Sequence, residues 1–178
     1  MNISKTASVS ALTLGLAFIL AAPQAQAVNL ARKLMVNASG ACQSALPVFD
    51  VNIRKRPKAV VNEGDSPAFV TCTYYAQGNG VDDNNNPTKV TIYVSTNILQ
   101  QTSITCTGIN GSELDNFPTN VKTVFMNNPV NTVAMTWIPQ DFGSFGTFPS
   151  PYFAVSCELK PDVAIHNAVI EYVQDVGQ

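Results

Sequence analysis

The sequence AFVTCTYYA at residues 68–76 decides the fold, because it is the clearest β-strand pattern in the chain. Successive side chains in a strand point to opposite faces of a sheet, so even-numbered residues share one face and odd-numbered residues share the other. The even-numbered face is small or apolar and includes Cys72. We therefore expect this strand in the middle of a sheet, with Cys72 pointing into a core that a disulfide crosses.

Similar alternation recurs along the chain, and no window of eleven or more residues after position 27 keeps the 3.6-residue period of a helix. In the segment 89–95 we expect Val90, Ile92 and Val94 to face inward and Thr91 and Tyr93 to face outward. Residues 161–167 are expected to form a connection before a final strand. The predicted strands are 28–36, 68–76, 89–95, 103–107, 121–126, 132–138, 152–159 and 168–173. Eight or nine short strands with turn signals between them predict an all-β fold, a single antiparallel, jelly-roll-like β-sandwich.

The first 27 residues have the pattern of a secretory signal peptide. Lys5 supplies a positive amino-terminal region, and residues 11–22 form a 12-residue apolar run that is too short to span a bilayer. Ala25 and Ala27 give the A-x-A pattern of a cleavage site. We expect a signal peptide at 1–27, one domain at 28–178, and a secreted or periplasmic protein without stable membrane insertion.

Four cysteines follow the predicted cleavage site: Cys42, Cys72, Cys106 and Cys157. An even number of cysteines behind a signal peptide predicts two disulfides. A metal site is disfavoured, because there is no C-x-x-C motif and the chain has one histidine. We favour the pairs Cys72–Cys106 and Cys42–Cys157. The other pairings stay open, since strands in a simple meander would keep Cys72 and Cys106 apart.

Loss of Lys5 with the signal peptide would leave nine Lys and Arg against twelve Asp and Glu, a net charge of −3. This balance gives no electrostatic reason to expect nucleic acid as a partner. The densest positive charge is the candidate basic patch of Arg54, Lys55, Arg56 and Lys58. It is either a site for anions or acidic polysaccharides, or a charged edge strand protected from further pairing, and we favour the edge strand.

The most aromatic part of the chain is WIPQDFGSFGTFPSPYF at residues 137–153. Its glycines and prolines exclude a stable helix, so we expect a long loop between strands. Phe142, Phe145, Phe148 and Tyr152 form a candidate binding surface for sugar rings or a partner protein. The alternative is that the loop closes the open end of the sandwich and buries its phenylalanines. Trp137 is expected in the core.

Catalytic signals are few. His166 is the only histidine, and no G-x-S-x-G motif is present. A carboxylate pair, for which Asp141 and Glu158 are the candidates near aromatic residues, would meet only in the fold. The D-x-N-x-N sequence beginning at Asp82 lacks the glycine and glutamate of a calcium loop. We expect no catalytic residue, metal or cofactor.

The sequence CQSALPVFDVNIRKRPKAVVNEGDSPAFVTC at residues 42–72 carries a resemblance. Its C-x-x-A-L-P start, I-R-K-R-P step, N-E-G turn and strand ending in cysteine resemble uncharacterised small secreted four-cysteine proteins of environmental proteobacteria. The resemblance implies export and the four-cysteine framework, and it implies no activity.

Taken together, the sequence favours a secreted, non-catalytic β-sandwich that acts as an extracellular binding module. Its partner is unknown, and a glycan or a cell-surface protein suits the uncharged polar surface. Two alternatives stay open. One is a structural subunit of a surface appendage or coat, assembling through sheet edges. The other is a small hydrolase that uses a carboxylate pair.

Overall fold

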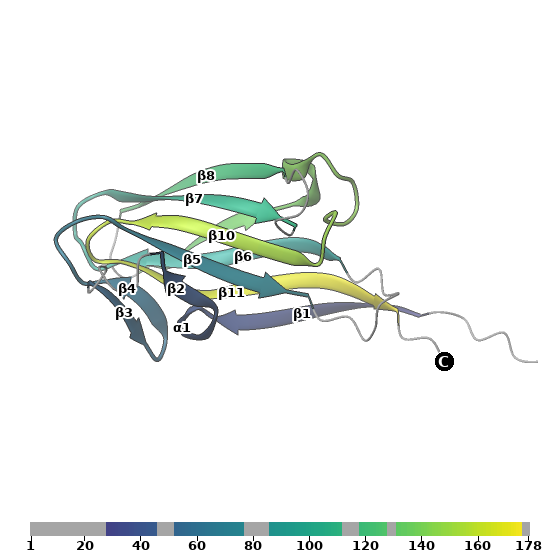
Figure 1. Cartoon of the computed structure of the whole chain (residues 1–178), viewed down its shortest axis with the longest axis horizontal. Helices are drawn as coiled ribbons and strands as arrows, with labels where there is room; N and C mark the ends of the chain where they lie inside the picture. Colours follow the sequence, from purple (N-terminus) through teal and green to yellow (C-terminus); the bar gives the residue numbers. More distant parts are fainter. Residues whose placement is uncertain (1–27, 46–51, 77–85, 112–117, 128–130, 176–178) are drawn as a thin grey trace, which may run out of the picture.

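The computed structural model describes residues 28–45, 52–76, 86–111, 118–127 and 131–175 (Figure 1). The predicted signal peptide and most of the D-x-N-x-N loop lie outside these described residues. In the described ranges, no helix is both long and apolar enough to cross a bilayer.

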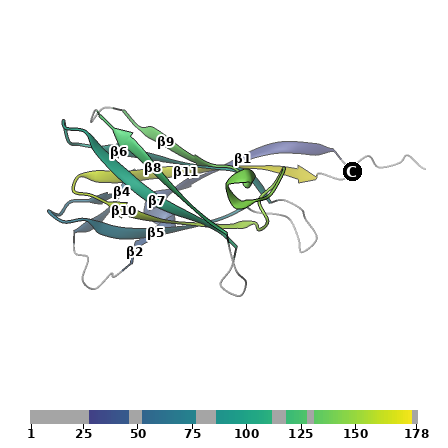
Figure 2. The same cartoon turned by 90° about the horizontal axis from the view of Figure 1, so that it is seen from above.

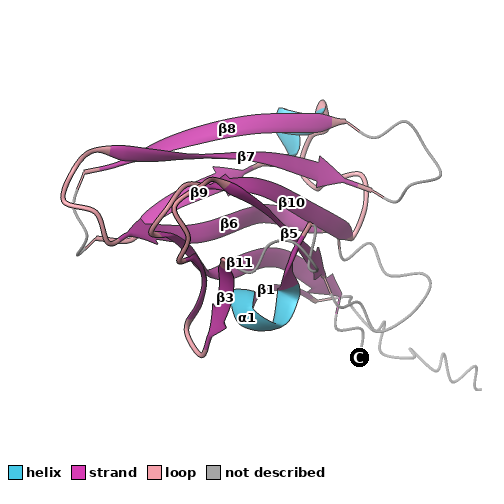
Figure 3. Cartoon of the chain, turned by 60° about the vertical axis from the view of Figure 1, so that its left-hand side comes forward, coloured by secondary structure: helices cyan, strands magenta, loops and turns pink. Residues whose placement is uncertain are grey.

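The described residues form two antiparallel sheets, named sheet A and sheet B. Sheet A contains β1 (Asn29–Asn37), β3 (Ile53–Arg56), β4 (Ala59–Asn62), β6 (Pro87–Thr96), β9 (Val133–Trp137) and β11 (Val163–Asp175). Sheet B contains β2 (Cys42–Ser44), β5 (Ala68–Tyr75), β7 (Thr102–Asn110), β8 (Thr119–Met126) and β10 (Tyr152–Leu159). A short helix α1 (Ala38–Ala41) packs against β1, β4 and β5, and a 3₁₀ helix η1 (Pro139–Phe142) follows β9 (Figure 3).

The strand order is that of a jelly roll. Sheet A has the order β4-β11-β6-β9 and sheet B has the order β5-β10-β7-β8, so successive strands from β4 to β7 alternate between the sheets. The predicted all-β, antiparallel, jelly-roll-like sandwich is therefore confirmed. In addition, β1 pairs with β11, and the paired ends of these two strands extend together beyond the neighbouring strands (Figure 2).

The alternation read from the sequence is confirmed in β5 and β6. In β5, Val70 and Cys72 are fully buried, whereas Phe69 is half exposed. In β6, Val90 and Ile92 face the core between the sheets, and the intervening side chains face away from it. The core thus forms between the inner faces of the two sheets, as the period of two requires.

One prediction about the carboxyl-terminal strand is wrong. Residues 161–167 were expected to form a connection, but β11 begins at Val163 and includes His166. The pairing of β11 with β6 contains a β-bulge between Ile165 and Asn167. The bulge interrupts the alternation at that point, so the segment does not have the sequence pattern of a regular strand. The short strands β2 and β4 were also not predicted, because three or four residues give too little alternation to recognise. The short strand β3 lies where a charged edge strand was favoured.

Both disulfides join directly opposite residues within sheet B. Cys42 on β2 is bonded to Cys72 on β5, and Cys106 on β7 is bonded to Cys157 on β10. The prediction of two disulfides is confirmed, but the favoured pairing is wrong. The reason is topological, since β10 lies between β5 and β7 and keeps Cys72 away from Cys106.

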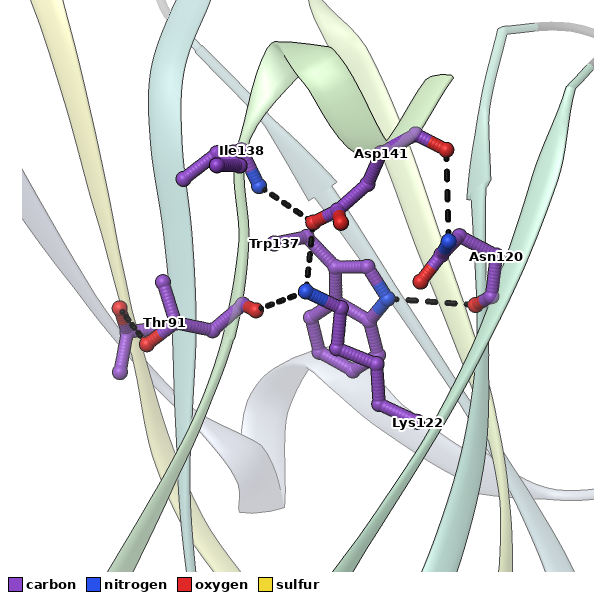
Figure 4. Close-up of polar contacts among 7 residues, drawn as sticks. Thr91, Asn120, Lys122, Trp137, Ile138 and Asp141 are labelled. Atoms are coloured by element: carbon purple, nitrogen blue, oxygen red, sulfur yellow. Dashed lines mark hydrogen bonds and ion pairs between the residues drawn. The ribbon is translucent and has the colours of Figure 1, made fainter. Parts of the chain in front are cut away.

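One edge of the sandwich is closed by side chains that join β8 of sheet B to β9 of sheet A (Figure 4). Trp137 Nε1 donates a hydrogen bond to the backbone oxygen of Asn120 at 3.2 Å. Lys122 Nζ donates to the backbone oxygen of Thr136 at 2.7 Å and to Asp141 Oδ2 at 2.5 Å. These bonds connect sheet A to sheet B at an edge where the two sheets share no paired strands.

The packing of Trp137 against β7 depends on Gly108. A Cβ atom at position 108 would lie 2.7 Å from Trp137 Nε1 and 3.0 Å from Phe153 Cζ, so a larger residue would displace the indole. Trp137 is fully buried, which confirms its predicted place in the core.

The disulfide pairing gives a direct prediction. Proteolysis of the unreduced protein should release linked peptides that contain Cys42 with Cys72 and Cys106 with Cys157, identified by mass spectrometry. A peptide that links Cys72 to Cys106 would contradict the strand order of sheet B. Thiol titration of the unfolded, unreduced protein is the control, and it should detect no free thiol.

Candidate functional site

Two hollows lie on the outer face of sheet A. These adjoining hollows of about 680 Å³ and 470 Å³ share Met35, Tyr93 and Val169 in their linings. Their remaining described lining residues are Lys33, Asn37, Lys58, Lys89, Thr91, Thr132, Ala134, Thr136, His166, Asn167 and Glu171. We call the two hollows together the sheet A groove.

Strand pairing arranges the groove residues in rows across the sheet. In the first row, Asn37 on β1 pairs with Asn167 on β11, and Asn167 pairs with Tyr93 on β6. Tyr93 in turn pairs with Ala134 on β9, which leaves space beside the ring because alanine is small. The aromatic ring therefore lies in the middle of the face, with amide groups on one side.

A second row lies two residues away from the first on each strand. It runs from Met35 on β1 through Val169 on β11 to Thr91 on β6 and Thr136 on β9. The two threonine hydroxyl groups are 2.9 Å apart and form a hydrogen bond. The row thus combines an apolar half, in which Met35 is 71% exposed, with a hydrogen-bonding half.

The β-bulge in β11 adds a histidine to this face. Ile165 pairs with Val94 and Asn167 pairs with Tyr93, so His166 is the extra residue of the bulge. His166 and Asn167 are adjacent in sequence, yet both line the same hollow. His166 Nε2 is hydrogen-bonded to Ser95 Oγ at 2.7 Å, which fixes the imidazole beside the first row.

The third row is charged. Glu171 on β11 lies between Lys89 on β6, with Nζ to Oε1 at 2.7 Å, and Lys33 on β1, with Nζ to Oε1 at 3.6 Å. The hydrogen bond from Lys89 and the positive charges of both lysines hold the pKa of Glu171 below its ordinary value, against a smaller opposing effect of burial. Glu171 is therefore ionised at neutral pH and neutralises one of its two lysine neighbours.

The structure does not bring the four aromatic residues of the candidate binding surface together. Phe142 and Phe148 are buried, with ring centroids 5.7 Å and 5.4 Å from that of Phe153. Phe145 is 88% exposed, and Tyr152 is half exposed on the outer face of sheet B. As a correction, the two buried phenylalanines belong to the core and cannot contact a ligand.

The backbone explains why Phe145 is exposed while Phe142 and Phe148 are buried. Gly143 and Gly146 adopt positive φ angles of 73° and 81°, so the chain turns on both sides of Phe145. The turns point Phe142 and Phe148 toward the core and leave Phe145 at the tip. The three phenylalanines were expected on one common surface, but their sequence positions do not fix the direction of each side chain where glycines turn the chain.

The candidate basic patch lies where an edge strand was expected. Arg54, Lys55 and Arg56 are exposed on β3, the terminal strand of sheet A next to β4. Arg56 forms a two-bonded ion pair with Glu63, with Nε to Oε1 and Nη2 to Oε2 both at 2.7 Å. Lys58 differs from the other three in position, because it lines the larger hollow of the sheet A groove.

The two candidate carboxylates do not form a pair. Asp141 forms an ion pair with Lys122. Lys122 pairs with Cys106 in sheet B, and this places Lys122 on the inner face. Glu158 is opposite Thr105 on the outer face of the same sheet. Asp141 and Glu158 therefore lie on opposite sides of sheet B, and they cannot act on one bond.

Nothing in the described ranges resembles a metal centre, because they contain no group of three His, Cys, Asp or Glu side chains placed to hold an ion.

The sequence signal for the sheet A groove was weak. Thr91 and Tyr93 were correctly predicted to face outward, but that alternation does not tell a solvent-facing residue from a ligand-facing one. The contributions of β1 and β11 depend on strand pairing, which the sequence does not show.

No family model matches the chain, and no curated protein matches it. The resemblance to small secreted four-cysteine proteins therefore stays a prediction. Among solved structures, the chain is similar to the CBM36-1 domain of a multidomain xylanase from the hindgut metagenome of Trinervitermes trinervoides. That match has a TM-score of 0.44 and 12% identity, and it covers 79% of this chain and 96% of the other.

It is also similar to the family 11 carbohydrate-binding module from Clostridium thermocellum in complex with a β-1,3-1,4-mixed-linked tetrasaccharide. Here the TM-score is 0.37 with 8% identity, covering 85% of this chain and 91% of the other. At these scores the similarity carries no conclusion about function. The fold assignment rests on the strand pairing described above.

The charged row predicts a pH-dependent contribution to stability. Because the pKa of Glu171 is lowered in the folded state, its ion pairs stabilise the fold above the ordinary glutamate pKa and stop doing so as the pH falls through the folded-state value. A Glu171→Gln variant should be less stable than the wild type at neutral pH, by less than about 1 kcal/mol for partly exposed pairs. Urea unfolding at neutral and acidic pH measures the difference.

Glu158→Gln is the matched control, because Glu158 forms no ion pair with any described residue. The stability difference between wild type and Glu171→Gln should vanish at acidic pH, where both side chains are uncharged. A difference that stays constant across the pH range would contradict the assigned ion pairs.

Proposed function

We propose that this protein is a non-catalytic binding module, secreted or periplasmic, that holds a polysaccharide in the sheet A groove. The observation that carries the proposal is the composition of the groove. Tyr93 lies at its centre, apolar side chains of Met35 and Val169 lie beside it, and hydroxyl and amide groups surround these three. Ligand sites in proteins commonly combine an apolar surface with a few polar groups that fix orientation.

A sugar ring matches this arrangement because it has two kinds of surface. Its C–H groups form an apolar face that packs against an aromatic ring, and its hydroxyl groups lie around the edge. Tyr93 offers the ring, while Thr136 and Asn167 offer donors and acceptors in the flanking rows. The groove crosses four strands, so it suits an extended chain of sugars better than a single small molecule.

The groove lacks the groups that glycoside hydrolysis needs. Most such enzymes use two carboxyl groups, one on each side of the bond that is cleaved. Among the described residues that line the groove, Glu171 is the only carboxylate, and it is paired with Lys89. The proposed role is therefore binding without turnover.

The disulfides support the proposed compartment. Both disulfides are buried in the core of sheet B, and disulfides persist in oxidising environments outside the cytosol. This supports the secreted or periplasmic location that the first 27 residues predict.

Three of the described edge strands argue against the alternative of a structural subunit that polymerises through sheet edges. The edge strand β3 carries three exposed positive side chains, and the edge strand β2 has three residues. On the edge strand β8, the charged Lys122 points inward. Short edges, positive charge and inward-pointing charged residues are the features that discourage strand addition.

The proposal predicts a dominant role for Tyr93. In affinity electrophoresis or calorimetry against a panel of soluble plant, fungal and bacterial polysaccharides, the wild type should bind at least one polymer. A Tyr93→Ala variant should bind that polymer at least about tenfold more weakly, equivalent to ~1.4 kcal/mol, because the aromatic surface is lost.

Tyr152→Ala is the matched control, since Tyr152 is half exposed on the outer face of sheet B and stacks on Tyr75 with a centroid distance of 4.8 Å. A third variant, Phe145→Ala, tests the exposed part of the aromatic loop. Binding that survives in Tyr93→Ala but is lost in Tyr152→Ala or Phe145→Ala would refute the sheet A groove as the site.

A further inference from the structure

We infer that the polysaccharide bound in the sheet A groove is acidic, with carboxylate groups along its chain, as in a polyuronate. This inference rests on the proposed function of the same groove and adds the chemical class of the ligand. It is supported by the distribution of charge over the molecule, because the groove is positive although the chain as a whole is negative.

The groove is positively charged although the protein is acidic. The chain has a formal net charge of −2, yet the described groove lining contains Lys33, Lys58 and Lys89 against the single carboxylate of Glu171. Counted over Lys, Arg, Asp and Glu, the groove lining carries an excess of two positive charges. A cleft lined by one sign of charge raises the local concentration of ligands of the opposite sign.

The positive charges lie at both ends of the groove. Lys89 is four residues from Tyr93 along β6, which corresponds to about 13 Å at ~3.3 Å per residue. Lys58 lines the other hollow, together with His166 and Asn167, and it forms no ion pair with any described residue. A ligand that covers Tyr93 and reaches both ends therefore meets separated cations, which suits a polymer with repeated negative charges.

Positive charge also continues beyond the groove. Arg54 on β3 pairs with Val61, and Val61 pairs with Ala164 on β11, so alternation places the arginine on the outer face of sheet A. Arg56 lies on the same face but is neutralised by Glu63. Arg54 thus extends the positive surface past Lys58 toward the edge of the sheet.

The groove suits an acidic polysaccharide better than a nucleic acid. The excess of two charges is small compared with the basic stripes of nucleic-acid-binding proteins. The apolar surface of Tyr93, Met35 and Val169 between the cations matches a sugar ring between charged groups.

The test compares polymers that differ in charge. Calorimetry or affinity electrophoresis is carried out with polygalacturonate, alginate and hyaluronate, and with neutral controls that include methyl-esterified polygalacturonate, galactan and xylan. At least one carboxylated polymer should bind. Among the probes, the methyl ester should bind at least about tenfold more weakly than polygalacturonate if polygalacturonate is the polymer that binds. Added salt should weaken binding, because exposed charges are screened beyond a Debye length of about 10 Å at 0.1 M.

Two double variants with the same change in net charge locate the effect. Lys33→Gln with Lys58→Gln removes groove cations but leaves the Lys89–Glu171 pair, and it should weaken binding about five- to tenfold. Lys55→Gln with Lys160→Gln is the control, because neither residue lines the groove and Lys160 bonds Ser103 of sheet B. The control should bind as the wild type does.

The outcomes separate the inference from the proposed function. If only neutral polymers bind, and Tyr93→Ala abolishes that binding, the proposed function stands and the acidic ligand is refuted. If both double variants weaken binding equally, the attraction comes from net charge and the groove assignment of the cations is overturned. If no polymer in either set binds, the inference and the proposed function fail together.

Discussion

The β-bulge at His166 is the constraint on which the candidate site depends. A regular β11 would alternate strictly, and His166 and Asn167 would then face opposite sides of sheet A. The bulge inserts one residue opposite β6, so both side chains line the groove while Ile165 and Ala168 stay in the core. The same irregularity therefore preserves the apolar inner face and adds an imidazole and an amide to the outer one.

The two sheets have different roles in the structure. Sheet B carries both disulfides, and its inner face meets the buried aromatic cluster of Phe142, Phe148 and Phe153. The bonds of Trp137 and Lys122 then fix the edge of sheet A to sheet B. Sheet A contributes an inner face to the core and is left with an outer face on which residues from four strands can vary without affecting a disulfide.

Much of the fold follows from the sequence, because alternation is a local property. It predicted the faces of β5 and β6 and the sandwich, and the even number of cysteines behind the predicted signal peptide predicted two disulfides. Cysteine pairing could not be predicted, since it depends on β10 inserting between β5 and β7. The site was mostly missed for the same reason. Tyr93 was expected to face outward, but its neighbours Met35 and Asn167 reach it through pairings far apart in the sequence.

The most direct test of the central claim is NMR mapping of ligand contacts. An oligomer of the carboxylated polymer that binds, for example oligogalacturonate, would be titrated into the ¹⁵N-labelled protein, and changes in backbone amide shifts would be measured residue by residue. The account predicts changes concentrated at Thr91, Tyr93, Asn167 and Val169, on the outer face of sheet A. Changes confined to the outer face of sheet B, around Tyr152, or the absence of any change would contradict it.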